Sequence, residues 1–256
     1  MTPRRSLALT SLHALLIALA VGAAAVATVT IARADSVTLS PAKDNTLYED
    51  AAGSLSNGVG QFFFAGRTAQ ATGSIRRALV AFDVSSIPAG STITGAQLVA
   101  HVAQGDATPR AATLHRLAAG WGEGASNAGT PGGGGAPSAA NDATWIHTFF
   151  SSAFWTSPGG DFAAGASATQ SLANVGFYAW GSTAAMVADV QQWLDAPATN
   201  FGWILRGVES ASGSARRLES RENIAPSLRP ALTVEYTPPP TAVDDASWGN
   251  VKALYR

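Results

Sequence analysis

The chain has 256 residues, a formal net charge of −1 and no cysteine. Without cysteine it can form neither a disulfide nor a lipid link to an N-terminal thiol, so its stability has to come from burial of apolar surface. Proteins that bind nucleic acid usually carry a basic patch, and the charge of this chain therefore argues against a nucleic-acid partner.

The first 34 residues have the pattern of a secretory leader. Arg4 and Arg5 precede an apolar run over residues 7–31, which ends in a small-x-small site at residues 32–34. We predict a signal peptide over residues 1–34, cleaved after Ala34 in bacterial-type export, and hence a secreted or cell-surface protein. The run is also long enough to cross a bilayer, so a retained anchor is the alternative.

Removal of the leader changes the charge. Residues 1–34 hold three of the 16 basic residues and no acidic one, so 13 basic and 17 acidic residues remain, a charge of about −4. We expect no nucleic-acid partner and, after cleavage, no contact with a membrane.

The first polar cluster of the mature chain is the segment KDNTLYED at residues 43–50. We interpret it as a turn. Its oxygen-bearing side chains Asp44, Asn45, Glu49 and Asp50 make a structural calcium ion the alternative, because calcium takes six to eight oxygen ligands. We expect no other cofactor.

Short apolar runs with turn residues between them predict strands over most of the remaining chain. The candidates are residues 77–84, 92–103, 112–117, 201–208, 215–220 and 231–236. In the second run, Leu98 and Val102 fall on one face and His101 on the other. The pattern predicts an all-β, jelly-roll-like antiparallel β-sandwich over residues 35–237.

Two segments interrupt these strands. Residues 129–140 are rich in glycine and are interpreted as a flexible insertion. Residues 142–162 hold Trp145, Trp155 and four phenylalanines. The rings of the second segment must close a core or offer flat faces to a ligand.

One amphipathic helix is expected within the domain. Ser182 can act as its N-cap, and Met186, Val190 and Trp193 follow at helical spacing. A single helix in a β domain would cover an edge or one end of the sandwich.

Residues 238–256 form a separate proline linker and short C-terminal tail. Trp248, Val251 and Leu254 fall on one side of a short helical pattern. The tail either packs on the domain or binds a docking partner.

Motifs of common enzymes are absent from the sequence. It has no nucleophile elbow, dinucleotide-binding glycine motif, phosphate-binding loop or zinc-protease motif. We therefore predict no catalytic residue, and keep a small polysaccharide hydrolase or lyase as an alternative because two carboxylates could meet in space.

Arginines are the first candidate ligand-binding residues. Arg217 and Arg221 are expected on one strand face with Glu219, while Arg76 and Arg77 lie on another candidate strand. A row of guanidinium groups would bind the carboxylates of an acidic polysaccharide in bidentate fashion. The alternative is a cross-strand ladder of Arg–Glu pairs.

Tryptophans are the second candidates. Trp121, Trp145 and Trp155 lie near glycines or turns, where an exposed indole could stack on a sugar ring. Burial of each indole in the core is the alternative. Trp193 and Trp203 fit helix and strand patterns and are predicted core residues.

An ordered series of segments resembles the DNRLRE domain, a family related to the disaggregatase repeat and grouped with carbohydrate-binding modules. The matching segments are residues 44–46 (DNT), 77–83 (RALVAFD), 87–93 (IPAGSTI), 121–124 (WGEG), 142–145 (DATW), 189–193 (DVQQW), 200–203 (NFGW), 219–223 (ESREN) and 229–236 (RPALTVEY). The resemblance covers about residues 37–236 and implies a secreted β-sandwich, with some relatives binding acidic polysaccharides such as alginate.

These observations predict a secreted, non-catalytic carbohydrate-binding module for an acidic polysaccharide, with a structural or adhesive module of the cell surface or matrix as the alternative. A binding module needs an exposed face that carries aromatic rings and unpaired arginines. A structural module would show the arginines matched by glutamates and the indoles buried.

Overall fold

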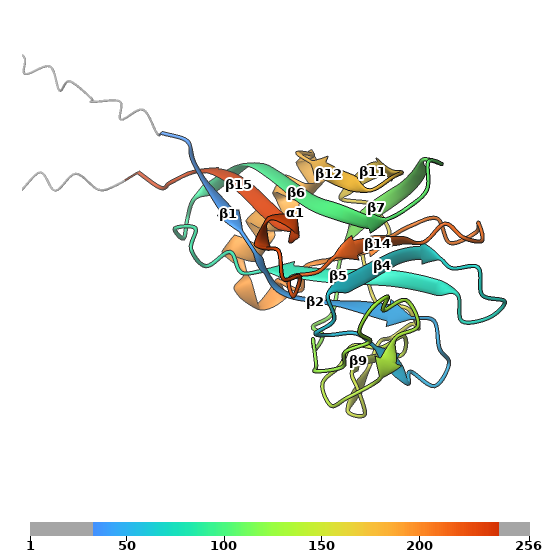
Figure 1. Ribbon diagram of the computed structural model, residues 1–256. Coiled ribbons are helices and arrows are strands. Elements are labelled where there is room, and N and C mark those ends of the chain that lie inside the picture. The colour runs from blue at the N-terminus through green and yellow to red at the C-terminus, as the bar shows by residue number, and fades with distance from the viewer. Residues whose placement is uncertain (1–32, 241–256) are drawn as a thin grey trace, which may run out of the picture. The chain divides into compact units, whose positions relative to one another are not determined.

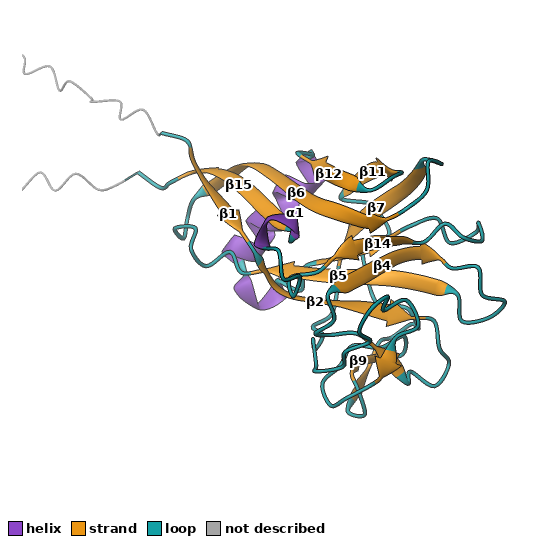
Figure 2. Cartoon of the chain, viewed as in Figure 1, coloured by secondary structure: helices purple, strands orange, loops and turns teal. Residues whose placement is uncertain are grey.

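The structure, a computed structural model, describes residues 33–240. Most of its regular structure is antiparallel strand, accompanied by one α-helix in the described part (Figure 1). Figure 2 shows the helix beside strands that are joined mainly by loops. The all-β class and the antiparallel sandwich with one helix are therefore confirmed.

Eleven strands form one large sheet. They are β1 (Asp35–Leu39), β2 (Pro41–Tyr48), β4 (Phe62–Arg67), β5 (Ile75–Phe82), β6 (Thr92–Gln104), β7 (Arg110–Arg116), β11 (Ala168–Leu172), β12 (Gly176–Gly181), β13 (Trp203–Arg206), β14 (Arg216–Glu219) and β15 (Ala231–Thr237). Two short ladders pair β3 (Leu55–Ser56) with β8 (Ala136–Pro137) and β9 (His147–Phe149) with β10 (Ala153–Phe154). The helical elements are α1 (Ala184–Asp195) and the 3-10 turns η1 (Pro197–Thr199) and η2 (Pro226–Leu228).

Strand order explains how the sheet closes on a core. The order is β1-β15-β6-β14-β4-β5-β13-β7-β11, with β12 beside β6 and β2 beside β5. Leu98 of β6, Val80 of β5 and Trp203 of β13 nevertheless share one buried cluster. Because strands distant in this order meet in one core, the sheet curls into two halves that face each other.

The long strand β6 follows its sequence pattern closely. Leu98, Ala100 and Val102 are buried in the core, whereas His101 points to the other face. All six predicted strands exist, with ends displaced by one or two residues in most of them. The core positions predicted for Trp193 and Trp203 are also confirmed, since both are fully buried.

The interpretation of residues 43–50 as a turn is wrong. Most of this segment belongs to β2, where Asp44, Asn45 and Thr46 are buried. Polar residues can occupy a buried strand because hydrogen bonds satisfy them: the Asn45 amide donates to the Glu123 carbonyl and the Thr46 hydroxyl accepts from the Phe64 amide.

Helix α1 begins one residue later than predicted. Its N-cap is Thr183, whose hydroxyl accepts a hydrogen bond from the Met186 amide at 3.1 Å, whereas the Ser182 hydroxyl bonds to the Ala96 amide of β6. Trp193 of the helix packs edge-on against Trp203, with ring centroids 4.4 Å apart. The helix thus closes the core that the sheet leaves open.

The loops around β9 form a second, smaller packed region next to β2 (Figure 1). The glycine-rich insertion is tied to the strands, because the Gly132 carbonyl accepts from the Tyr48 hydroxyl and the Gly133 carbonyl accepts from Arg76. Backbone groups, which the sequence pattern does not reveal, thus hold this insertion in place.

Both chain ends extend outside the described residues. The predicted signal peptide lies there except for its last two residues, and so does the C-terminal tail from residue 241 onward. Within residues 33–240, no helix has the length and apolar character needed to cross a membrane.

Candidate functional site

Strand β14 directs Arg217 away from the core. Leu218 is fully buried between the two halves of the sheet, so its neighbours Arg217 and Glu219 point to the outer face, as the alternation of the sequence predicts. The Arg217 guanidinium carbon lies 4.2 Å from the centroid of the Phe62 ring on β4. This cation–π contact holds the guanidinium in place without neutralising it.

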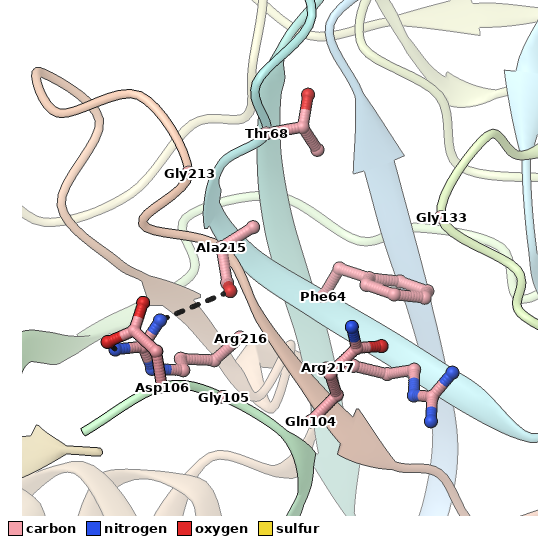
Figure 3. A pocket seen from close by; sticks show the side chains of 10 residues that line it. All are labelled: Phe64, Thr68, Gln104, Gly105, Asp106, Gly133, Gly213, Ala215, Arg216 and Arg217. Carbon is pink, nitrogen blue, oxygen red and sulfur yellow. Dashed lines mark hydrogen bonds and ion pairs between the residues drawn. The ribbon is translucent and has the colours of Figure 1, made fainter. Parts of the chain in front are cut away.

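A pocket of about 330 Å³ opens beside Arg217 (Figure 3). Its lining residues are Phe64, Thr68, Gln104, Gly105, Asp106, Gly133, Gly213, Ala215, Arg216 and Arg217. Figure 3 shows Arg216 and Asp106 at one side, and Arg217 with Gln104 and Phe64 at the other. We call this hollow the Arg217 pocket.

The two sides of the Arg217 pocket differ in charge. Arg216 is neutralised, because its Nη2 lies 3.0 Å from Asp106 Oδ1 and also donates to the Thr108 carbonyl. Arg217, by contrast, has no carboxylate within ion-pair distance among the described residues, and its Nε is buried without a hydrogen-bond partner. The Arg217 guanidinium, which forms no ion pair among the described residues although it is near enough to Glu219 to lower the pKa of that carboxyl, therefore faces a hollow with polar and apolar walls.

Arg76 has a different environment. It is buried, its guanidinium lies 4.7 Å from the Tyr48 ring centroid, and it donates to the Gly73 and Gly133 carbonyls. The arginine therefore ties two loops to β5. Its buried position leaves it no exposed surface for a ligand.

Arg77 and Trp145 are brought together. The Arg77 guanidinium lies 4.9 Å from the Trp145 ring and pairs with Glu209 at 2.8 Å. Arg206 also pairs with Glu209, at 3.1 Å. Burial raises the pKa of Glu209, but hydrogen bonds from the two arginines outweigh that effect and hold the pKa below its usual value. The charge of Arg77 is thus matched by a carboxylate.

Arg221 does not share the strand face of Arg217, because β14 ends at Glu219 and Arg221 lies in the following turn. It forms a forked ion pair with Glu123, at 2.6 and 2.7 Å, and a contact of 2.8 Å with Glu222. Its charge is therefore fully used within the protein.

The backbone amide of Arg221 donates to a second carboxylate, the buried Asp44, at 2.7 Å. Burial and the nearby Glu222 raise the pKa of Asp44 well above its usual value. Glu222 also has a raised pKa, chiefly through burial. Neither carboxyl lines the Arg217 pocket.

The predicted row of guanidinium groups is not formed. Arg76, Arg77, Arg217 and Arg221 each have their own contacts, and no two of them share a partner among the described residues. Successive residues of a strand point to opposite faces, which alone separates Arg76 from Arg77.

Trp121 and Trp155 offer no exposed ring face. Their exposed fractions are 1% and 5%, and their indole Nε1 atoms donate to the Phe201 and Thr144 carbonyls. Loops close over both rings, which corrects the expectation that these two indoles stack on a ligand. Trp145 is only partly buried.

The four calcium candidates make separate hydrogen bonds to the protein. Asp50 accepts from the Ser54 amide in the following loop, and Glu49 accepts from the Ile75 amide at the start of β5. Asn45 accepts from the Ser56 hydroxyl, and Asp44 accepts from the Arg221 amide. Residues 33–240 contain no group of three His, Cys, Asp or Glu side chains able to hold a metal ion. A structural calcium stays a prediction.

Phe62 and Gln104, which lie beside Arg217, were not predicted as candidate binding residues from the sequence. The three consecutive phenylalanines at residues 62–64 carried a usable signal, because strand alternation places the central ring in the core and its two neighbours outside. Gln104 comes opposite Arg217 through a shift of register between β14 and β6, which the sequence does not mark.

No family model matches the chain, and no curated protein matches it. The resemblance to the DNRLRE domain stays a prediction.

Proposed function

We propose that the protein is a non-catalytic binding module for an acidic polysaccharide and that the Arg217 pocket receives one of its carboxylates. The observation that carries this proposal is the guanidinium of Arg217, which packs on Phe62, lines the pocket and has no ion-pair partner among residues 33–240. A guanidinium group matches a carboxylate with two parallel hydrogen bonds.

The other pocket walls suit a carbohydrate. Gln104 and Thr68 supply amide and hydroxyl groups that can bond to sugar hydroxyls, and Phe64 supplies an apolar surface. Rim residues Gly105, Gly133 and Gly213 have no side chains that would obstruct a polymer chain. A pocket with these walls can hold a sugar unit within a longer chain.

The carboxylate content of the pocket favours a binding role over a catalytic one. Asp106 is the single carboxylate among the lining residues, and it is paired with Arg216. Glycoside hydrolysis requires two carboxylates across the scissile bond, one of them free to donate a proton. A secreted or cell-surface location completes the proposal, since a polysaccharide ligand would be met there.

Affinity electrophoresis tests this function. The mature protein is run in gels containing alginate, pectate, xylan or cellulose, next to Arg217→Ala and to the control Arg206→Ala, which removes an equal charge from an arginine that pairs with Glu209 outside the pocket. We expect retardation by alginate or pectate alone and loss of most of it in Arg217→Ala. Retardation that is equal in all four gels, or equal for Arg217→Ala and the wild type, would contradict the proposal.

A structural module of the cell surface or matrix is the second candidate. The charges of Arg77 and Arg221 are matched by glutamates, and Trp121 and Trp155 are buried, which is the pattern expected of such a module. Absence of retardation in every gel would favour this function.

A further inference from the structure

The outer face of four neighbouring strands carries a row of side chains next to the Arg217 pocket. The register pairs Phe62 of β4 with Glu219 of β14, and His101 of β6 with Phe177 of β12. β14 and β6 are also neighbours, and His101 Nδ1 lies 3.9 Å from Glu219 Oε1. The row Phe62–Glu219–His101–Phe177 therefore crosses the sheet at right angles to its strands.

All four side chains lie on the face opposite the core. Their strand neighbours Phe63, Leu218 and Val102 belong to the buried core, and Tyr178, the neighbour of Phe177, packs against it; side chains of a strand alternate between the two faces. The row thus runs from the Phe62 ring, on which Arg217 packs, to Phe177 on β12; Phe62 and Glu219 within it are largely buried, whereas Phe177 is exposed.

Phe177 ends this row with an exposed ring. Its exposed fraction is 57%, and its ring meets His101 edge-on with centroids 4.7 Å apart. The contact with His101 fixes the ring, while much of its surface stays in water. Burial of this apolar surface under a ligand would be favourable.

The distance between Phe177 and Arg217 restricts the ligand. Phe177 lies two strands from β14 and about two residues along it from Arg217, which corresponds to roughly 12 Å from ordinary strand spacings. One sugar ring cannot span this separation. A ligand that touches both residues must be a chain of several sugar units.

On the basis of the proposed function, we propose that Phe177 is a second subsite, which makes the protein selective for linear chains over single acidic sugars. One carboxylate of the chain binds Arg217, the chain crosses Glu219 and His101, and the apolar C–H face of a later sugar unit packs on Phe177. The occupant is a linear polyuronate, because the charged end of this surface is a guanidinium that no carboxylate of residues 33–240 pairs with.

Calorimetry with galacturonate oligomers of graded length, from one unit to six, tests this subsite. Wild-type protein is compared with Phe177→Ala, with Arg217→Ala and with Phe154→Ala. Phe154 is a matched control, because it is another exposed phenylalanine, with an exposed fraction of 65%, and it packs against His147 away from this row. Exposed side chains of this kind can be removed without unfolding the protein.

The expected result is an affinity that rises with chain length in the wild type and in Phe154→Ala. Phe177→Ala should bind the shortest oligomers as the wild type does but bind the longest about fivefold to tenfold more weakly. If Phe177→Ala keeps full affinity for the hexamer while Arg217→Ala loses it, the second subsite is wrong and the proposed function stands. If the wild type binds no acidic oligomer, both are wrong.

Discussion

Arg221 and Glu123 lie 98 residues apart in the chain and form a forked ion pair, in which Nε and Nη2 of the arginine each donate to one carboxylate oxygen. The Asp44 amide on β2 donates to the same carboxylate. Glu123 therefore connects β2, the loop after β7 and the turn after β14.

Replacement of Glu123 by glutamine should destabilise the domain. The change leaves the Arg221 charge without its forked partner, and we expect the free energy of unfolding to fall by about 1 to 3 kcal/mol. Urea denaturation of Glu123→Gln, Arg221→Gln and the double variant gives the coupling energy between the two residues. A coupling near zero would mean that the pair behaves as an ordinary surface ion pair.

Trp121→Phe separates the structural role of an indole from a ligand-binding role. The variant loses the hydrogen bond to the Phe201 carbonyl and part of a buried ring. Its free energy of unfolding should therefore fall by about 1 to 3 kcal/mol, which thermal unfolding detects as a lower midpoint temperature. Affinity for acidic polysaccharide should stay unchanged. Weaker polysaccharide binding at full stability would show that Trp121 contacts the ligand.

Asp44 should make stability depend on pH. Burial and Glu222 raise its pKa in the folded protein above the unfolded value, so the folded state holds the proton more tightly. Its contribution to stability is present below the unfolded pKa, near 4, and is lost as pH rises through the folded pKa. The charged groups around it are Glu123, Arg221 and Glu222.

Asp44→Asn should therefore be more stable than the wild type at neutral pH, by about 1 to 3 kcal/mol, with a smaller difference near pH 4. Denaturation across this pH range measures the effect. The corresponding change at Asp83 should have the opposite effect on stability, because hydrogen bonds from Ser85 lower the pKa of Asp83. We therefore expect Asp83→Asn to be less stable than the wild type at neutral pH. Lower stability of Asp44→Asn at neutral pH would contradict the account.

Glu219 should make ligand binding depend on pH. Its pKa is raised by burial, although Asn223, His101 and Arg217 act in the opposite direction. Once ionised, this carboxylate repels an acidic chain that crosses β14. Affinity for pectate should therefore fall as pH rises from about 5 to about 8, above the usual glutamate pKa.

The variant Glu219→Gln should bind pectate more tightly at the upper end of that range and show a flatter pH profile. Calorimetry at several pH values compares it with the wild type. An identical pH profile in the two proteins would exclude Glu219 as the titrating group.

The sequence predicted the fold better than the site, for physical reasons visible in individual residues. Strands such as β6 and β15 were predictable, because one face is apolar and the other polar. β2 was missed, because its buried Asp44, Asn45 and Thr46 are satisfied by hydrogen bonds from distant segments. Such partners leave no mark in a local pattern.

Site residues were harder to predict, because the availability of a side chain depends on partners far along the chain. Arg77 and Arg217 look alike in sequence, yet Glu209 neutralises the first and no described carboxylate pairs with the second. Trp121 near a glycine looks exposed, but the loop at Phe201 covers it. The alternation of residues 92–103 predicted the outward position of His101, whereas no sequence pattern predicted that Phe177 of β12 lies beside it.

The most direct test compares the binding of pectate with that of its fully methyl-esterified form by calorimetry. The ester keeps the sugar chain and removes the negative charge, so the comparison isolates the contact with Arg217. We predict binding of pectate, at least tenfold weaker binding of the ester, and a loss of this difference in Arg217→Ala. Equal binding of pectate and ester by the wild type, or binding of neither, would contradict the proposal that Arg217 receives a carboxylate.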